Sequence, residues 1–174
     1  VYDVAFEKDE INLISVAKLM KTKGFDRLIK IQKKLRDNGY KTHIYIVGKG
    51  EEEVSLEKLI KENGLENSFT LIGFRENPYK YVKNADLYVC SSRKEGFSTA
   101  VTEALIVGTP VVSTNCSGAE ELLGSGNEYG IVTENNEDSL YNGITKMLSD
   151  KGGLEYYKKR AEIRGSKFNT EETV

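Results

Sequence analysis

The sequence is poor in the residues on which several kinds of protein chemistry depend. Its 174 residues include one histidine, two cysteines, two prolines and no tryptophan. His43, Cys90 and Cys116 are together too few for a structural zinc site, which takes about four Cys or His ligands. Two cysteines also argue against a disulfide scaffold in a chain of this size. We therefore expect reduced cysteines that only pack, a strand histidine without a chemical role, and no metal site.

Long hydrophobic runs and an excess of one charge are absent as well. No apolar run approaches the roughly 18 residues that a membrane-spanning helix needs. The 25 basic and 27 acidic residues give a net charge of −2, which calls for no nucleic-acid partner. The composition is that of a soluble globular protein, and the length predicts a single domain over residues 1–174. Because the chain starts at Val1 with no signal peptide, we expect a processed or truncated cytoplasmic protein.

Short apolar runs alternate with amphipathic stretches along the chain. The apolar runs predict six strands, at residues 11–16, 43–47, 69–72, 87–90, 110–114 and 130–133. The amphipathic stretches predict helices at residues 24–38, 52–63, 77–84, 118–123, 138–148 and 154–168, and one capped by Ser98 or Thr99 that runs to Val107. This alternation predicts the α/β class, a Rossmann-like doubly wound parallel sheet of about six strands with helices on both faces.

Sheets of this kind bind ligands in the loops at the carboxyl ends of their strands. The loop after the first strand, residues 18–24, carries three lysines but no Gly-x-Gly-x-x-Gly fingerprint, which argues against a redox dinucleotide domain. Lysines just before a helix can hold a phosphate, although lysine runs are usually solvated, and this loop taken alone favours that interpretation. Gly48, after the second strand, allows either close backbone approach to a ligand or a plain turn.

The loop after the fourth strand contains two carboxylates that are eight residues apart. Helical side chains lean toward the helix N-terminus, so Glu103 should point toward the loop that holds Glu95. The backbone N–H groups of residues 96–98 could face an anion at the same place. Ionised carboxylates accept hydrogen bonds from sugar hydroxyls, so the segment fits a nucleotide sugar. The alternatives are an exposed Glu95, and a Glu103 that is exposed or paired with a lysine.

These segments together resemble the C-terminal, nucleotide-sugar-binding domain of retaining glycosyltransferases with the GT-B fold, family 4, the glycosyl transferases group 1. The resemblance covers residues 12–148. Its most specific part is the Glu-x7-Glu motif from Glu95 to Glu103, followed by Gly-Thr-Pro-Val-Val at 108–112. Residues 18–25, 47–50 and 118–121 resemble three further family segments in the same order. There are departures: Ala17-Lys18 replaces the usual Gly-Arg, and Ser98-Thr99 replaces a small residue followed by proline.

The resemblance implies a role for each of these segments. It implies metal-independent transfer without a cofactor, in keeping with the absence of an Asp-x-Asp motif. The implied sites are Lys18 and Lys23 for the donor diphosphate, Glu103 for the ribose, and Glu95, Gly96, Phe97 and Ser98 for the transferred sugar and phosphates. Gly48, Phe74 and Arg75 are implied to lie near the nucleotide, the last two of them near its base.

The resemblance also implies partners. GT-B enzymes place their active site between two Rossmann-like domains, and this chain has room for one. We therefore expect a nucleotide-sugar donor, a UDP-sugar first, a saccharide or lipid-linked acceptor, and an N-terminal acceptor domain that this chain lacks. The isolated chain should bind the donor without transferring the sugar. A GT-B epimerase or hydrolase of nucleotide sugars and a non-catalytic interaction module are the alternative functions.

A basic stretch runs from residue 18 to residue 36, with eight basic residues against one acid, Asp26. Cations near a helix C-terminus are favourable, so a solvated helix face explains the pattern. The alternative is a patch around Lys30, Lys33 and Lys34 that meets an anionic membrane. That alternative would place the protein at the inner face of the membrane.

Overall fold

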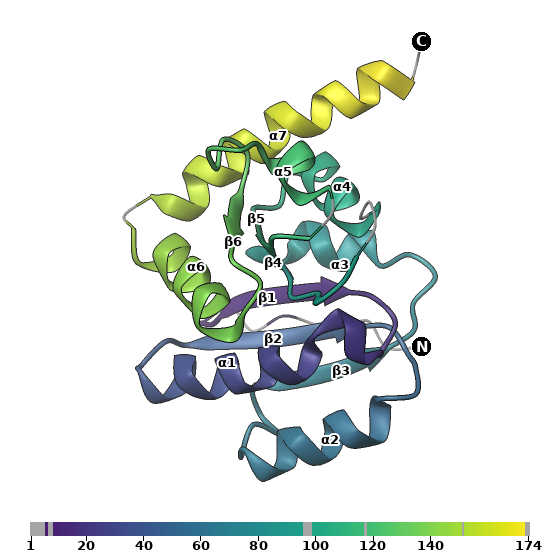
Figure 1. Cartoon of the computed structure of the whole chain (residues 1–174), viewed down its shortest axis with the longest axis vertical. Helices are drawn as coiled ribbons and strands as arrows, with labels where there is room; N and C mark the ends of the chain where they lie inside the picture. The colour runs from purple at the N-terminus through teal and green to yellow at the C-terminus, as the bar shows by residue number, and fades with distance from the viewer. Residues whose placement is uncertain (1–5, 7–8, 96–98, 117, 151, 173–174) are drawn as a thin grey trace.

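The computed structural model describes residues 6, 9–95, 99–116, 118–150 and 152–172. A sheet of six parallel strands forms its centre, in the order β3-β2-β1-β4-β5-β6 (Figure 1). The predicted α/β, doubly wound class is therefore confirmed. The strands are β1 (Ile11–Val16), β2 (Thr42–Val47), β3 (Phe69–Gly73), β4 (Leu87–Cys90), β5 (Val111–Thr114) and β6 (Ile131–Thr133).

The strand order places β1 and β4 side by side in the middle of the sheet. The chain adds β2 and β3 on one side of β1, then crosses back and adds β4, β5 and β6 on the other. The loops after β1 and β4 consequently leave neighbouring carboxyl ends and diverge toward different helices. This reversal is the topological switch point at which open α/β sheets bind their ligands.

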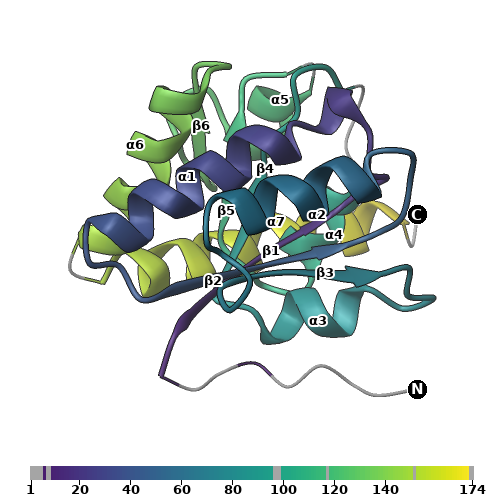
Figure 2. The same cartoon turned by 90° about the horizontal axis from the view of Figure 1, so that it is seen from below.

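Helices cover both faces of the sheet, as the buried strands require. Figure 2 shows α1 and α2 on one side of the sheet and α3 on the other. Residues alternate between the two cores along each strand, so Leu13 packs on the α1 side and Ile14 on the α3 side. The helices are α1 (Phe25–Asp37), α2 (Glu53–Glu62), α3 (Tyr79–Asn84), α4 (Thr99–Ile106), α5 (Ala119–Leu123), α6 (Glu137–Ser149) and α7 (Gly153–Glu172).

The predicted elements are all present, with small differences at their ends. A 3-10 turn, η1 (Lys21–Lys23), precedes α1 and was not predicted, because three residues give no periodic signal. Helix α6 starts one residue before the predicted position, where the Asn136 side chain accepts a hydrogen bond from the backbone N–H of Ser139 at 2.7 Å. Helix α7 continues past the predicted end to Glu172.

The residues set aside as structural are found in structural positions. His43 lies in β2, where its Nε2 is 2.7 Å from the hydroxyl of Thr70 and its ring stacks on Tyr45. Both cysteines are free thiols; Cys90 is buried at the end of β4, and Cys116 is half-buried two residues after β5. Within the described residues, no helix combines the length and the apolar character of a membrane span.

Candidate functional site

A cavity of about 400 Å³ opens at the carboxyl ends of β1 and β4. The loop after β1 contributes Lys18 and Lys23, and the loop after β4 contributes Ser92 and Glu95. The first residues of α4, beginning at Thr99, close one side. The cavity therefore stands at the switch point of the sheet, and its lining carries both signs of charge.

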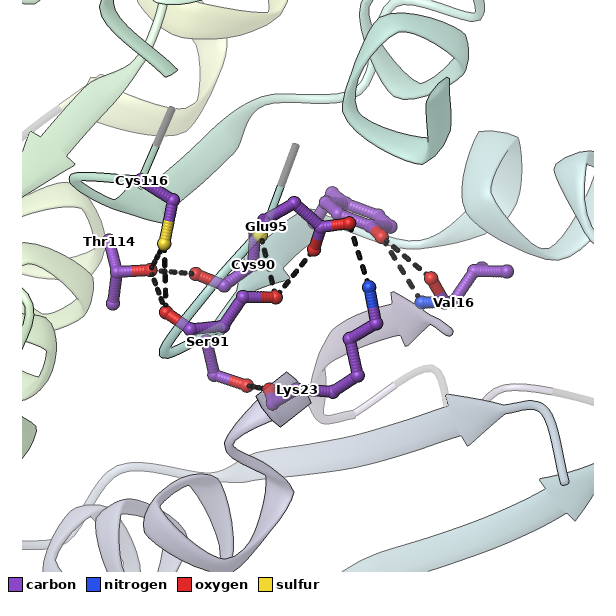
Figure 3. Close-up of polar contacts among 9 residues, drawn as sticks. Val16, Lys23, Cys90, Ser91, Glu95, Thr114 and Cys116 are labelled. Carbon is purple, nitrogen blue, oxygen red and sulfur yellow. Dashed lines mark hydrogen bonds and ion pairs between the residues drawn. The ribbon is translucent and has the colours of Figure 1, made fainter. Parts of the chain in front are cut away.

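The two oppositely charged side chains meet across this cavity. Lys23 Nζ lies 2.7 Å from Glu95 Oε1, and both side chains are about four-fifths covered, at 20% and 18% exposure. Their aliphatic stems approach from different loops, and the charged ends point toward one another (Figure 3). The second carboxylate oxygen of Glu95 accepts a hydrogen bond of 2.6 Å from the Ser92 hydroxyl. Glu95 is thus a fixed part of the cavity wall rather than an exposed loop acid.

The loop segment that precedes Glu95 is hydrogen-bonded to the end of the neighbouring strand, β5. The Ser92 carbonyl accepts hydrogen bonds from the Thr114 hydroxyl at 2.7 Å and from the Cys116 thiol at 3.1 Å. Both donors follow or end β5, so β5 supports the β4 loop from its far side. These bonds hold the backbone of the β4 loop at Ser92, three residues before Glu95.

Tyr88 forms the buried floor of the same cavity. Its phenol donates to the Val16 carbonyl and accepts from the Val16 backbone N–H, both at 3.2 Å. Burial raises the pKa of Tyr88, so the phenol stays protonated and keeps its donor at neutral pH. Burial likewise raises the pKa of Cys90, whose thiol also lines the floor, which disfavours the nucleophilic thiolate.

A second cavity of about 800 Å³ adjoins the first along the loop after β1. Val16, Ala17 and Lys18 line both cavities, so Lys18 marks the boundary between them. The far wall of the second cavity comes from the loops after β2 and β3. There the Phe74 ring is 60% exposed, and Lys49 Nζ lies 5.5 Å from its centroid.

Gly48 allows the loops after β1 and β2 to lie in direct contact beside the residues that the two cavities share. It has a φ of +149°, and a Cβ atom at this position would collide with the carbonyl oxygen of Ala17. The β2 loop therefore lies directly against the β1 loop, backbone to backbone. The close approach at Gly48 is to the chain's own backbone, and an approach of Gly48 to a ligand stays a prediction.

Most of the predicted site residues line these two cavities. Lys23 and Glu95 line the first, Lys18 lines both, and Gly48, Phe74 and Arg75 line the second. The predicted residues Gly96, Phe97 and Ser98 lie outside the described residues.

Glu103 is half-buried on α4, and it is not among the described residues that line either cavity. Burial and the Glu103 carboxylate together raise the pKa of the Tyr79 phenol, which places Glu103 near the first residue of α3. Tyr79 directly follows Pro78, a residue of the second cavity wall. The role of Glu103 at the ribose stays a prediction.

Three residues of the site were missed by sequence reasoning. Ser92 holds Glu95, Tyr88 fixes the end of β1, and Lys49 covers the Phe74 ring. Ser92 and Lys49 follow the carboxyl ends of predicted strands, and this position alone could have marked them as site residues. Tyr88 gave no signal, because a tyrosine within an apolar run is indistinguishable from a core residue.

No group of three or more His, Cys, Asp or Glu side chains that could hold a metal ion occurs in the described part of the chain.

Comparison with known proteins identifies the family. The sequence model of the glycosyl transferases group 1 family matches residues 3–164. The chain belongs to this family. Among curated proteins, this glycosyltransferase chain is 36% identical over 169 residues to the N-acetylgalactosamine-N,N'-diacetylbacillosaminyl-diphospho-undecaprenol 4-alpha-N-acetylgalactosaminyltransferase of Campylobacter jejuni, covering 96% of this chain and 45% of that protein. It is 35% identical over 117 residues to an uncharacterized glycosyltransferase of Methanocaldococcus jannaschii, covering 67% of this chain and 29% of that protein.

Solved structures share the fold of this chain. The crystal structure of HepE of Anabaena in complex with UDP matches with a TM-score of 0.82 and 25% identity, covering 91% of this chain and 44% of that one. TarM of Staphylococcus aureus matches with a TM-score of 0.82 and 22% identity, covering 94% of this chain and 34% of that one. This second likeness shows the fold alone. The present chain thus spans less than half the length of each of these relatives.

Proposed function

We propose that this chain is the donor-binding half of a retaining, metal-independent glycosyltransferase that transfers a sugar from a UDP-sugar to a saccharide or lipid-linked acceptor. One observation carries the proposal: a cavity lined by lysines and a carboxylate adjoins a larger cavity with an exposed aromatic ring, and Lys18 belongs to both. A nucleoside-diphosphate sugar needs a charged site for its diphosphate and sugar beside a less polar site for its base.

The charges in the first cavity suit the chemistry of sugar transfer. The bond between the anomeric carbon and the diphosphate breaks, and its electron pair stays on the departing oxygen. The acceptor hydroxyl forms the new bond to the anomeric carbon and gives its proton to the departing diphosphate oxygen. Lys18 and Lys23 would stabilise the negative charge on the diphosphate, which is the role that a metal plays elsewhere. Glu95 would accept hydrogen bonds from the sugar hydroxyls once the donor has displaced Lys23 from it.

The relatives support a lipid-linked acceptor and a uridine donor. The Campylobacter protein is named for a diphospho-undecaprenol acceptor, and HepE was crystallised with UDP. In GT-B enzymes the acceptor side is built by a second domain, so we propose that the acceptor binds outside the described residues. The present chain would then supply the donor site alone.

The test of the proposed function is nucleotide binding by the 174-residue chain. We expect one nucleoside diphosphate among UDP, GDP and ADP to raise the melting temperature, with NAD giving no shift. At 100 times its dissociation constant a ligand adds about 2.7 kcal/mol to the free energy of unfolding. Lys18→Ala should weaken binding about tenfold, because a charge-assisted hydrogen bond contributes about 1.5–3 kcal/mol.

The matched control for Lys18→Ala is Lys41→Ala. Lys41 is also exposed, but it precedes β2 at the opposite edge of the sheet. Its removal should leave nucleotide binding unchanged. A melting-temperature shift with NAD alone, or no shift with any of the four ligands, would contradict the proposed function.

We also propose a peripheral contact of the whole protein with anionic membranes through α1, at the cytoplasmic face. Lys33 pairs with Asp37 at 3.0 Å, and Lys34 pairs with Glu137 and Asp138, each at 3.1 Å. An unpaired lysine near an anionic membrane contributes about 1 kcal/mol to binding, and these ion pairs reduce that contribution. Neutralising Lys30, Lys33 and Lys34 together should therefore weaken binding to phosphatidylserine vesicles by less than about 1 kcal/mol per lysine. Co-sedimentation measures this change, and unchanged binding would exclude the α1 contact.

A further inference from the structure

The loops that carry Lys23 and Glu95 lie in direct backbone contact. The Ser91 hydroxyl donates a hydrogen bond of 2.8 Å to the carbonyl of Lys23 (Figure 3). Gly24 has a φ of +69°, and a Cβ atom there would collide with the carbonyl oxygen of Ser91. The loop after β1 and the loop after β4 therefore cross at Gly24, one residue away from the lysine that faces the cavity.

Arg93 joins the same two loops on their outer side. Its guanidinium forms two parallel hydrogen bonds to the Asp26 carboxylate, each of 2.7 Å, and a third of 2.8 Å to the carbonyl of Lys21. Its backbone N–H donates to the carbonyl of Thr22 at 2.7 Å. One residue of the β4 loop thus binds two adjacent residues of η1, Lys21 and Thr22, and Asp26 in the first turn of α1.

The Arg93–Asp26 pair is charged at neutral pH. The hydrogen bond to Asp26 raises the pKa of Arg93. Burial acts to raise the pKa of Asp26, but the hydrogen bond and the charge of Arg93, together with backbone hydrogen bonds, outweigh burial, and the pKa of Asp26 is lowered. Two parallel bonds between charged partners also fix the orientation of both side chains, which a single bond would not.

A third loop supports this pair from the side of β6. The Asn135 amide donates a hydrogen bond of 2.8 Å to the carbonyl of Arg93, and its oxygen accepts one of 2.6 Å from Arg27. Arg27 belongs to α1, so Asn135 connects the same two elements again. Arg93 itself is not among the described residues that line either cavity. Arg93 can therefore affect a bound donor only through the loops or through its charge, which the paired Asp26 carboxylate offsets.

We propose that Arg93 is a positioning residue for the donor. Its pairing with Asp26 holds the β1 and β4 loops together, so that Lys23 and Glu95 face one cavity before the donor arrives. This inference rests on the proposed function. A site whose loops are already ordered does not spend binding free energy on ordering them, so removing the pair should weaken donor binding.

If the Arg93–Asp26 pair served folding alone, its loss would lower the melting temperature and leave nucleotide affinity unchanged. The Arg93 and Asp26 side chains are 37% and 34% exposed, and ion pairs of this exposure contribute only about 0–1 kcal/mol to folding. Losing the pair should therefore lower the melting temperature little while lowering nucleotide affinity more. Arg36 provides the matched control, because its guanidinium also binds one carboxylate, Glu10 at 3.1 Å, and one carbonyl, Thr42 at 3.3 Å. It lies at the other end of α1, away from the cavities.

The experiment is calorimetric titration of UDP, GDP and ADP into the 174-residue chain and its variants. We expect Arg93→Ala and Asp26→Ala each to weaken binding of the recognised nucleotide about tenfold, which is about 1.4 kcal/mol. The double variant should lose no more than either single one. Arg93→Lys, which keeps the charge but not the paired bonds, should fall between wild type and Arg93→Ala. Arg36→Ala should bind as wild type does.

A second background tests whether Arg93 acts through Lys23. In the Lys23→Ala variant, adding Arg93→Ala should cause no further loss of affinity. Unchanged affinity in Arg93→Ala, or a further tenfold loss in the Lys23→Ala background, overturns this inference while leaving the proposed function intact. Wild-type protein that binds none of the three nucleotides overturns the proposed function instead. If Arg93→Ala does not fold, Asp26→Asn gives the same test, because it keeps the side-chain shape but removes the charge and one of the two oxygens that accept from Arg93.

Discussion

Replacing Glu95 by glutamine should strengthen the binding of UDP to this chain and weaken the binding of a UDP-sugar. The Glu95 carboxylate holds Lys23 at 2.7 Å, so a diphosphate must compete with it for the ammonium group. The carboxylate also repels the diphosphate, and this repulsion between charges about 4 Å apart amounts to several kcal/mol near a protein surface before screening. Glu95→Gln removes both obstacles, and we expect UDP affinity to rise about tenfold.

The sugar moiety reverses the sign of this effect. Hydroxyl groups of the transferred sugar would donate to the ionised Glu95, and a hydrogen bond to a charged group contributes about 1.5–3 kcal/mol. Glu95→Gln should therefore weaken UDP-glucose relative to UDP by about 100-fold, which exceeds the tenfold gain for the nucleotide, and transfer by the whole protein should fall about 100-fold or more. Paired calorimetric titrations of UDP and UDP-glucose measure the first quantity, and initial rates measure the second.

Glu62→Gln is the control for the loss of one negative charge. Glu62 is exposed on α2, where it pairs with Lys58 at 3.8 Å and lies outside both cavities. Its replacement should change neither affinity. If Glu95→Gln shifts UDP and UDP-glucose in the same direction by the same factor, then Glu95 does not bind the sugar.

The framework of the site could be predicted from the sequence, because its signals are local. Apolar runs of four to six residues, each followed by an amphipathic stretch, determine a parallel sheet. That sheet places the loops after β1 and β4 at one edge. The prediction that Lys18, Lys23 and Glu95 belong to one site follows from this rule and from the family resemblance, and all three line the first cavity.

The contacts within the site could not be predicted, because they join residues that are distant in the sequence. Lys23 and Glu95 are 72 residues apart, and Arg27 and Asn135 are 108 apart. Nothing in either local sequence distinguishes a lysine that will be paired from one that will be solvated. Arg93 shows the same limit: beside Lys94 it resembles an ordinary basic loop residue, and only the position of Asp26 gives it two parallel hydrogen bonds.

Gly48→Ala should cost more stability than the loss of either ion pair that joins the β1 and β4 loops. A Cβ atom at Gly48 would collide with the carbonyl oxygen of Ala17, which is backbone and cannot rotate away. The β1 loop or the β2 loop must therefore shift: a shift of the β1 loop moves Lys18, and a shift of the β2 loop moves the opposite wall of the second cavity. We expect the free energy of unfolding to fall by about 3 kcal/mol or more, within the upper range for strained and overpacked positions. UDP binding should be lost together with stability.

Gly39→Ala separates the collision from the cost of the backbone angle. Gly39 has a φ of +86°, so alanine is strained there too, but nothing lies within 4 Å of the added Cβ atom. Its expected cost is only about 1–2 kcal/mol, with UDP binding intact. Thermal denaturation should show the difference as several degrees, because 1 kcal/mol shifts the melting temperature of a chain of this size by about 2–4 °C. Equal losses in the two variants would mean that the loops after β1 and β2 yield freely, and that their contact does not set the position of Lys18.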